Sequence, residues 1–334
     1  MKAAWQRQKE GKVITRPRIC DKNRTEILPD LNFSHGFQVS LFHSNSSAGR
    51  LAGFLDYGGQ AADGAPCWQL SQWGCTHDLA KAAFSRNGSV MRYDDGGKCV
   101  TVDVANAQIT LSIKGSEEYP RDREGRVRER VGQMENWPHL LAEQTEVNFV
   151  LPHAIRHLYM FLDYEVTHCE TLVDRNIYPE NVMMHAGMFV WFLHLTDIDP
   201  ESVSYLRSMW FGVKMYDTRF CGRTPAAEAG YDTGKEDSTG LFIFIPSLEE
   251  VARQQGSQVT LPSSVIGRRS VVRFDALPFL EKALMTARSM GAMAGARVEG
   301  LRIDSTNIGW ELMGNNDAEV RIYSLDLIGE TEGE

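Results

Sequence analysis

Four segments between Trp137 and Arg219 carry ionisable and aromatic side chains that alternate with apolar ones: WPHLLAEQTEV, HLYMFLDYEV, MFVWFLHLTDI and SMWFGVKMYDTRF. Alternation with a period of two is typical of a β-strand that buries one face. One parity predicts a core, and the other predicts a surface rich in Trp, His, Glu, Asp, Lys and Tyr. Such groups can pack on a ligand, exchange protons with it or stabilise its charge.

Parity in these segments, and in the later segment TNIGWELMG, assigns two sets of side chains to opposite faces. The predicted core set is Leu140, Ala142, Leu158, Met160, Leu162, Phe189, Trp191, Leu193, Phe211, Val213, Met215, Ile308 and Leu312. The predicted groove set is Trp137, His139, Glu143, Tyr159, Asp163, Glu165, His194, Trp210, Lys214, Tyr216 and Glu311. Side chains that share a face of neighbouring strands stand about 5 Å apart, so the second set would form one groove.

Paired carboxylates in such a groove could hydrolyse a glycosidic bond. The two must flank the scissile oxygen, about 5 to 5.5 Å apart for retention of configuration and about 6.5 to 9.5 Å apart for inversion. We expect Glu143 and Glu165 to form the pair, with Asp163 and Glu311 in reserve. The alternative is that these acids form ordinary cross-strand salt bridges with Lys214 or Arg128.

The same groove could instead serve a polysaccharide lyase. In that chemistry His139 or Tyr216 would remove the proton next to a uronate, while Lys214 or Arg130 would neutralise the carboxylate. Parity does not choose between the two reactions.

Aromatic side chains in the groove set suit a carbohydrate ligand. Sugar rings present C–H faces that pack on Trp and Tyr, and their hydroxyl groups need partners that donate and accept hydrogen bonds. Trp137 and Trp210 would be the platforms, although a Trp in a strand is more often part of the core. The residues expected to bind substrate are Trp137, Trp210, Lys214, Tyr216, His194 and Glu311.

Composition excludes several other classes of protein. The 334 residues carry a formal charge of -9 with a pI near 5.6, which argues against a nucleic-acid partner. The Arg-rich segment Arg121–Arg130 is mixed with acids and is typical of a solvated loop or hairpin. No apolar run of about 18 residues occurs, so no membrane association is expected. Without a secretory signal, a cytoplasmic location is expected, and an extracellular or periplasmic one fits only if the beginning has been trimmed.

Cysteine and histidine spacing predicts neither a disulfide scaffold nor a metal site. The six Cys are scattered and form no CxxC pair, and the nine His form no recognisable ligand set. P-loop, GxGxxG and GxSxG motifs are also missing at positions where they would work. No cofactor is therefore expected.

Short strands and glycine turns run through most of the chain. Residues 1–30 are expected to form an N-terminal arm, and residues 31–330 a single β-sandwich domain. One longer helix is predicted over Asp275–Met290, with Gly291 ending it. A parity change in AEVRIYSLDLIG predicts a bulge near Ser324. The polar segment Thr224–Ser238 is predicted to be a long loop of the kind that often covers a binding site.

The order of these elements resembles the concanavalin A-like jelly-roll β-sandwiches found in carbohydrate-active proteins. The resemblance runs over about Gly36–Gly329 and ends on the strand pair TNIGWELMG and AEVRIYSLDLIG. It implies an all-β fold of two antiparallel sheets with one late α-helix, and a glycan on the concave face. Neither the Glu-x-Asp-x-Glu strand of laminarinase-like hydrolases nor the Gln-Ile-His strand of alginate-lyase-like enzymes occurs, so no catalytic residue is carried over.

Three functional interpretations follow, and the first is favoured. It is a glycoside hydrolase that acts on an oligo- or polysaccharide through Glu143 and Glu165. The second is a sugar-binding protein, similar to a lectin, that uses the same Trp-rich face without cleavage. The third is an assembly protein, such as a homo-oligomer, in which the aromatic face packs against a partner chain.

Overall fold

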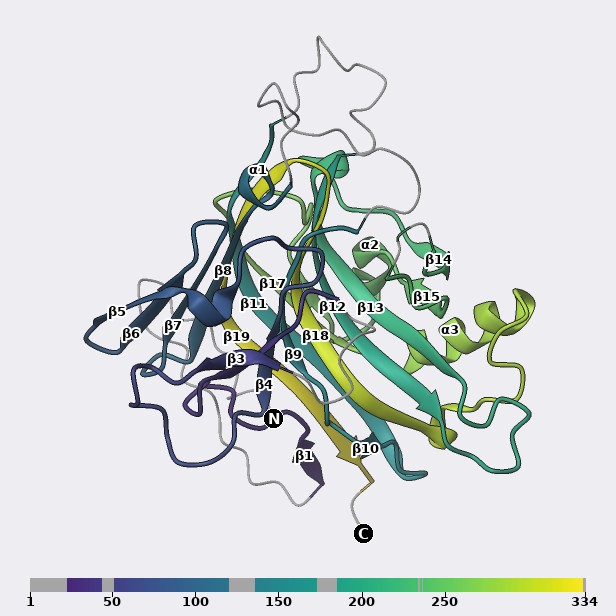
Figure 1. Ribbon diagram of the computed structural model, residues 1–334. Helices are drawn as coiled ribbons and strands as arrows, with labels where there is room; N and C mark the ends of the chain where they lie inside the picture. The colour runs from purple at the N-terminus through teal and green to yellow at the C-terminus, as the bar shows by residue number, and fades with distance from the viewer. Residues whose placement is uncertain are drawn as a thin grey trace.

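The structure is a computed structural model that describes residues 23–43, 51–119, 136–172, 185–233, 235 and 237–332. Two large β-sheets stack face to face (Figure 1). The first, here called the β11 sheet, contains in spatial order β16 (Gln258–Val259), β17 (Arg269–Asp275), β11 (Ile155–Thr171), β19 (Asn316–Thr331), β8 (Gln108–Lys114), β7 (Lys98–Asp103), β6 (Val90–Asp94) and β5 (Ala83–Asn87), with β1 (Arg24–Glu26) also paired to β19. The second, called the β12 sheet, contains β14 (Glu228–Tyr231), β15 (Phe242–Ile245), β13 (Ser208–Asp217), β12 (Ala186–Asp197), β18 (Leu301–Met313), β9 (His139–Gln144), β4 (Trp68–Ser71), β2 (Phe37–Ser40) and β3 (Leu51–Leu55), with β10 (Phe149–Val150) beside β18.

Among the described residues, helices are few and lie at the periphery. They are α1 (Gly115–Glu118), α2 (Leu248–Ala252) and α3 (Leu277–Ser289), with single 3-10 turns at Leu79–Lys81, Thr218–Phe220 and Val298–Gly300. In the described part of the chain, no helix is both long and apolar enough to cross a membrane. The predicted all-β sandwich with one late helix is therefore confirmed.

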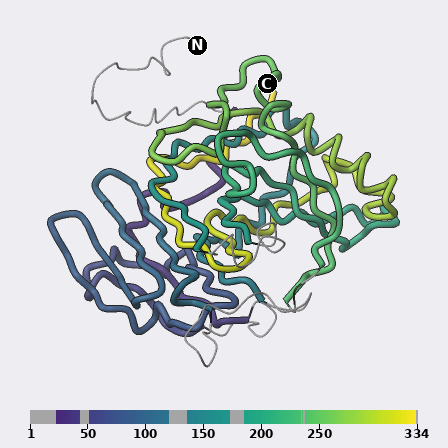
Figure 2. The backbone as a smooth tube through the Cα atoms, turned by 90° about the horizontal axis from the view of Figure 1, so that it is seen from above, coloured from purple at the N-terminus to yellow at the C-terminus, as the bar shows by residue number. Residues whose placement is uncertain are grey.

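Each of the last two long strands lies in the interior of one sheet. β19 lies between β11 and β8, and β18 lies between β12 and β9. In Figures 1 and 2 these yellow strands separate the purple and blue strands of the first half of the chain from the green strands of the second. All pairings are antiparallel except β2 with β4 and β13 with β15.

A single apolar core fills the space between the sheets, and parity predicts its members correctly. All thirteen predicted core residues are at most 1% exposed and belong to this core. The reason is that each strand turns alternate side chains toward the opposite sheet, where Trp, Phe, Leu and Ile leave water. The other parity of the β12 sheet consequently faces away from the core.

Two local predictions are also confirmed. Helix α3 begins at Leu277, whose backbone N–H donates to the Asp275 carboxylate at 3.1 Å, and Gly291 follows its end with φ +85°. Near Ser324, the register of β19 against β11 shifts between the pairs Asp163/Ser324 and Tyr164/Ile322, which is the predicted bulge.

Some predictions concern residues that the structure does not describe. Most of the N-terminal arm lies outside the described residues, as does the Arg-rich segment Arg121–Arg130. The described end of the arm contributes β1, whose residues pair with β19 near the C-terminus.

Gly309 allows β18 to approach β9 closely at the centre of the β12 sheet. A Cβ at this position would lie 2.1 Å from the Leu140 carbonyl oxygen and 2.9 Å from Leu141 Cα. Because both contacts are with backbone, we expect Gly309→Ala to lower the free energy of unfolding by about 1–3 kcal/mol, measured by urea denaturation. The control is Gly230→Ala in edge strand β14, where a Cβ would have no described atom within 4 Å. Equal stability of the two variants would contradict this packing.

Candidate functional site

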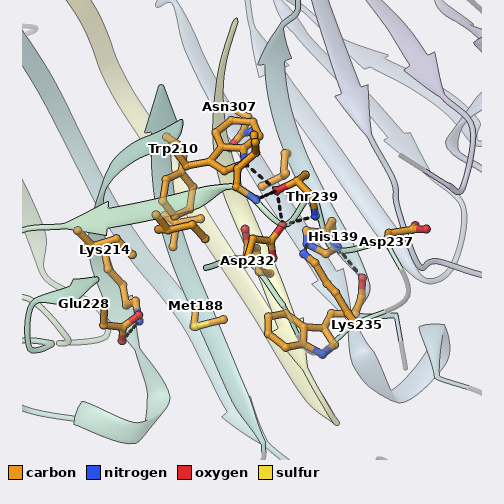
Figure 3. A pocket seen from close by; sticks show the side chains of 18 of the residues that line it. His139, Met188, Trp210, Lys214, Glu228, Asp232, Lys235, Asp237, Thr239 and Asn307 are labelled. Carbon is orange, nitrogen blue, oxygen red and sulfur yellow. Dashed lines mark hydrogen bonds and ion pairs between the residues drawn. The ribbon is translucent and has the colours of Figure 1, made fainter. Parts of the chain in front are cut away.

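A cleft of about 700 Å³ opens on the face of the β12 sheet that points away from the core. Its floor comes from β9, β18, β12, β13 and β15, and the segment from β14 to Leu241 covers one side (Figure 3). The lining includes seven of the residues predicted for the groove: Trp137, His139, Glu143, His194, Trp210, Lys214 and Glu311. Parity therefore identifies the face of this sheet that carries the cleft.

Strand register arranges the cleft floor in rows. Asn307 of β18 lies between Glu143 of β9 and Phe192 of β12. Two rows away, Glu311 lies between His139 and Met188. The four-residue step from Asn307 to Glu311 corresponds to about 13 Å along the strand, so Glu143 and Glu311 are attached at opposite ends of the floor.

Glu143 is held firmly at its end of the cleft. Its Oε2 accepts hydrogen bonds from Ser71 Oγ at 2.7 Å and from Gln69 Nε2 at 3.3 Å, and the side chain is 6% exposed. Burial raises the pKa of this carboxyl, while the two hydrogen bonds oppose the rise. Glu143 is thus positioned to offer its second oxygen to a ligand.

Glu311 differs from Glu143 because its carboxyl accepts no hydrogen bond from any described side chain or backbone group. Burial raises its pKa; Asp232 adds to the rise and Lys235 opposes it. Asp232 follows β14 and accepts hydrogen bonds at 2.7 Å from both the backbone N–H and the hydroxyl of Thr239. Glu311 and Asp232 therefore line the same cleft in contrasting environments. The surroundings of Glu311 favour its protonated form, whereas the Asp232 carboxylate accepts two hydrogen bonds.

His139 is neutral near neutral pH. Burial, followed by the charge of Lys235, lowers its pKa from 6.5 to about 3. Its Nδ1 lies 2.5 Å from the Trp137 carbonyl oxygen, which can only accept, so Nδ1 carries the proton. Nε2 then accepts from Lys235 Nζ at 3.4 Å, and that ammonium also lies 5.0 Å from the centre of the Trp137 ring. The imidazole therefore links the Trp137 backbone to Lys235 in the cleft wall, and its low pKa makes it a weak base.

The buried His139 should make stability depend on pH. The unfolded chain takes up a proton near pH 6.5, and the folded protein does so only near pH 3, so this contribution is complete above pH 6.5 and falls as pH decreases toward 3. Between pH 7 and pH 5 we expect a loss of about 2 kcal/mol in the free energy of unfolding from this group. Urea denaturation at both pH values measures it.

Two His variants provide the comparison. His139→Asn should show a smaller loss between the two pH values than the unmodified protein, whereas His168→Asn, at an exposed position of β11, should show the same loss. An unchanged loss in His139→Asn would mean that this side chain is not buried as described.

Lys214 is engaged in ion pairs at the β13 edge of the cleft. Its ammonium lies 2.5 Å from a Glu228 carboxylate oxygen and 3.4 Å from Asp217. Arg219 also binds Asp217, with Nη2 at 2.6 Å. The charges at this end largely neutralise one another, which is the salt-bridge alternative considered for this lysine.

Three Trp residues and His194 line the cleft. The Trp210 ring lies 4.7 Å from the His194 ring, and its Nε1 donates to Thr239 Oγ1 at 3.3 Å. Burial lowers the pKa of His194, and the nearby Asp304 opposes that change. Trp137 and Trp73 stand on the β9 side, where Trp73 lies 5.8 Å from the His139 ring. Rings are therefore available on both sides of the cleft.

Part of the floor is an apolar cluster separate from the core between the sheets. Its buried members are Ala186, Met188, Val190, Phe192 and Ile245, and Trp137, Trp210, Ile243 and Met313 pack against them. Gly212 contributes to this surface, since a Cβ there would lie 2.2 Å from Phe192 Cδ1. The Phe192 ring can therefore lie over the neighbouring strand.

Three predicted groove residues lie on the opposite side of the sandwich. Tyr159, Asp163 and Glu165 belong to β11, whose strand neighbours are β17 and β19. Asp163 forms a two-pronged ion pair with Arg269 at 2.7 and 2.8 Å, and Glu165 accepts from the Tyr323 hydroxyl at 2.8 Å. The structure does not bring Glu143 and Glu165 together, because β11 and β9 lie in different sheets and both side chains point outward.

Tyr216 is a core residue and not a groove residue. The register of β13 against β12 shifts between the pairs Phe189/Tyr216 and Val190/Lys214, so Met215 and Tyr216 both enter the core. The Tyr216 ring lies 6.1 Å from Trp310 and is 1% exposed. After this bulge, the alternation between core and cleft side chains is reversed at the end of the strand. Tyr216 therefore does not face the cleft and cannot act there as the base of a lyase.

Several cleft residues were not predicted, although some had a signal in the sequence. Trp73 lines the cleft, and Gln69 and Ser71 hold Glu143 by hydrogen bonds. All three alternate with buried Trp68 and Leu70, which is the pattern used for the other strands. Asn307 shares the parity of Glu311 in its strand. The alternation in β12 likewise leaves Met188, Val190 and Phe192 on the cleft face, because Phe189, Trp191 and Leu193 are in the core. Asp232 and Lys235 lie within the predicted loop Thr224–Ser238, part of which forms β14.

Among the described residues, no group of three His, Cys, Asp or Glu side chains is arranged to hold a metal ion. The ionisable groups of the cleft are placed one or two at a time on separate strands. The chemistry considered below uses only these side chains.

Comparisons with known proteins add a likeness of fold. No protein-family model matches the chain, and no curated protein matches it in sequence. The chain is similar to solved structures of family 12 glycoside hydrolases.

A family 12 xyloglucanase from Bacillus licheniformis has a TM-score of 0.37 and 9% identity, covering 77% of this chain and 100% of that one. Endoglucanase Cel12A from Rhodothermus marinus has a TM-score of 0.36 and 10% identity, covering 73% and 93%. Endo-1,4-β-glucanase CelB2 has a TM-score of 0.35 and 12% identity, covering 75% and 97%. The predicted resemblance to jelly-roll sandwiches concerns the fold, and a likeness at this level says nothing about the chemistry of the cleft.

Proposed function

We propose that this protein binds a glycan in the cleft of the β12 sheet and hydrolyses it with Glu311 as the general acid. The observation that carries the proposal is the cleft itself, which combines aromatic rings with two carboxyls of raised pKa, one buried at Glu143 and one partly exposed at Glu311. Perturbed acids that line a cleft are more common at functional sites than elsewhere.

Asn307 supports a ligand rich in hydroxyl groups. Its Oδ1 is buried and accepts no hydrogen bond among the described residues, although the side chain is only 4% exposed. Leaving a buried acceptor unsatisfied is costly. Asn307 lines the cleft beside Glu143, so a ligand hydroxyl could donate to both groups. The Trp73 and Trp137 rings on the β9 side would pack against the C–H faces of the sugars.

The acid pair that best fits hydrolysis is Glu311 with Asp232. Glu311 retains its proton more readily than an ordinary glutamate and could give it to the leaving oxygen. Asp232 accepts two hydrogen bonds from Thr239, and it could attack the sugar or activate a water molecule. Glu143, at the other end of the floor, would bind and orient the glycan.

A second candidate is a sugar-binding protein without hydrolytic activity. It is favoured by the separation of Glu143 from Glu311 along the floor and by the ion-paired state of Lys214. Both candidates require the glycan to occupy the same cleft, and they differ only in whether Glu311 and Asp232 act as a pair.

A panel of neutral and uronate-containing polysaccharides tests the proposal. Reducing ends report hydrolysis, absorbance from new double bonds reports elimination, and affinity electrophoresis reports binding. We expect new reducing ends without unsaturation from the unmodified protein and from Glu165→Gln, because Glu165 lies on the opposite side of the sandwich. Activity equal in Glu311→Gln and in the unmodified protein would reject the assignment of the acid. Binding without products would support the second candidate, and neither binding nor products would reject both.

A further inference from the structure

The two sides of the cleft floor differ in chemistry. His139 and Glu143 of β9, with Asn307 and Glu311 of β18, make one side polar. On the other side, β12 and β15 contribute mainly aliphatic and aromatic side chains, among them Val190 and Ile243. The exceptions on the polar side are Leu141 and Met313. On the apolar side they are His194, whose ring packs on Trp210, and Lys214, which Glu228 and Asp217 neutralise.

The apolar side offers little to a fully hydroxylated ligand. A sugar placed over Val190, Phe192 and Ile245 would lose water from its hydroxyl groups and find no donor or acceptor there. An apolar group in the same place would gain free energy in proportion to its buried area. The division of the floor therefore selects a ligand with one polar and one apolar part.

We infer that the ligand is amphipathic: a glycan that carries an apolar group, such as an alkyl or aryl aglycone or an acyl chain. This inference rests on the proposed function and names its substrate class. The sugar lies over β9 and β18, against Glu143, Asn307 and Glu311. The apolar group lies over β12, β13 and β15, beside the Trp210 ring. Five neighbouring strands span about 19 Å, which accommodates both parts side by side.

Three small probes test the inference at concentrations below their micellar range. Octyl β-D-glucoside carries both parts, methyl β-D-glucoside carries the sugar, and octyl tetraethylene glycol ether carries the chain without a sugar. Isothermal titration calorimetry measures their affinities, and the corresponding galactosides repeat the comparison with another sugar. Since each buried methylene strengthens binding roughly fourfold, we expect octyl glycoside to bind at least about 30-fold more tightly than methyl glycoside. It should also bind about 10-fold more tightly than the sugarless ether.

Ile243→Ser and Val271→Ser form a matched pair of variants. Both residues are half-buried β-branched side chains in strands, but Ile243 lines the cleft and Val271 of β17 lies on the opposite sheet. Ile243→Ser should lower affinity for octyl glycoside about 5- to 10-fold and leave methyl glycoside unchanged. Val271→Ser should alter neither affinity.

The outcomes separate this inference from the proposed function. Equal affinity for octyl and methyl glycosides would overturn the inference, while glycan binding in the polysaccharide panel would leave the proposed function standing. Equal affinity for octyl glycoside and the sugarless ether would overturn both, because the sugar would contribute nothing. Failure of every octyl glycoside to bind would also overturn the inference.

Discussion

Replacing Glu311 by glutamine is expected to lower the rate of glycan hydrolysis by a factor of about 10²–10⁴, which is typical for loss of a general acid. Glutamine keeps the shape of the side chain and loses the proton that the leaving oxygen needs. Because Glu311 accepts no hydrogen bond from a described residue, the substitution should leave the fold and the affinity for glycan nearly unchanged. Initial rates measured with calorimetric affinities separate the two effects.

The pH dependence provides an independent check on the same residue. Glu311 must be protonated to act as an acid, and burial raises its pKa. Activity should therefore persist above the pKa of an ordinary glutamate and decrease as pH rises through the raised value. Asp232→Asn should also reduce the rate, whereas Glu165→Gln should not. A Glu311→Gln variant with the rate and pH profile of the unmodified protein would contradict the assigned role.

Replacing Lys98 by methionine is expected to lower the free energy of unfolding by about 3–5 kcal/mol, the usual cost of breaking a buried ion pair. The Lys98 ammonium is fully buried and donates to Glu118 at 2.6 Å and to the His77 carbonyl oxygen at 2.7 Å. Methionine fills a similar volume but removes the cation from the fully buried Glu118 carboxylate, which keeps its hydrogen bonds from the backbone N–H groups of Thr76 and His77. Urea denaturation at neutral pH measures the loss.

Two further variants show whether the loss arises from the unpaired charge. Lys98→Met combined with Glu118→Gln should recover part of the stability, because no uncompensated carboxylate would then remain at position 118. Lys282→Met breaks the partly exposed pair with Glu250, at 2.6 Å, and should change stability by less than about 1 kcal/mol. Similar losses in Lys98→Met and Lys282→Met would contradict the burial of the Lys98 pair.

Side-chain parity predicted the faces of the strands because burial acts on each strand separately. In β9, β12, β13 and β18, the residues that leave water alternate with those that line the cleft, and no knowledge of neighbouring strands is needed to see it. Leu140 and Glu143, for example, were assigned correctly from WPHLLAEQ alone.

Parity could not predict which strands share a sheet. Glu165 has the same local pattern as Glu143, but β11 pairs with β17 and β19, and those partners are distant in sequence. The same limit explains Trp73, which follows β4, a strand far from β9 in the chain and next to it in the sheet. Pairing depends on contacts over the whole core, which a local pattern does not contain.

Bulges and loops account for the remaining differences. One extra residue in β13 turned Tyr216 into the core, and a single sequence offers little warning of such a shift. Asp232 acts on the pKa of Glu311 through its charge, from a loop whose hydrogen bonds with Thr239 depend on the tertiary fold.

The most direct test of the central claim is to locate the bound glycan by nuclear magnetic resonance of the Trp indole N–H groups. Tetrasaccharides of several linkages would be titrated into protein labelled with nitrogen-15. The signals of Trp73, Trp137 and Trp210 in the cleft should shift on binding. Those of the fully buried Trp68, Trp191 and Trp310 should stay in place and serve as controls within the same spectrum. Binding that leaves the three cleft signals unmoved would contradict the claim that the β12 sheet carries the glycan site.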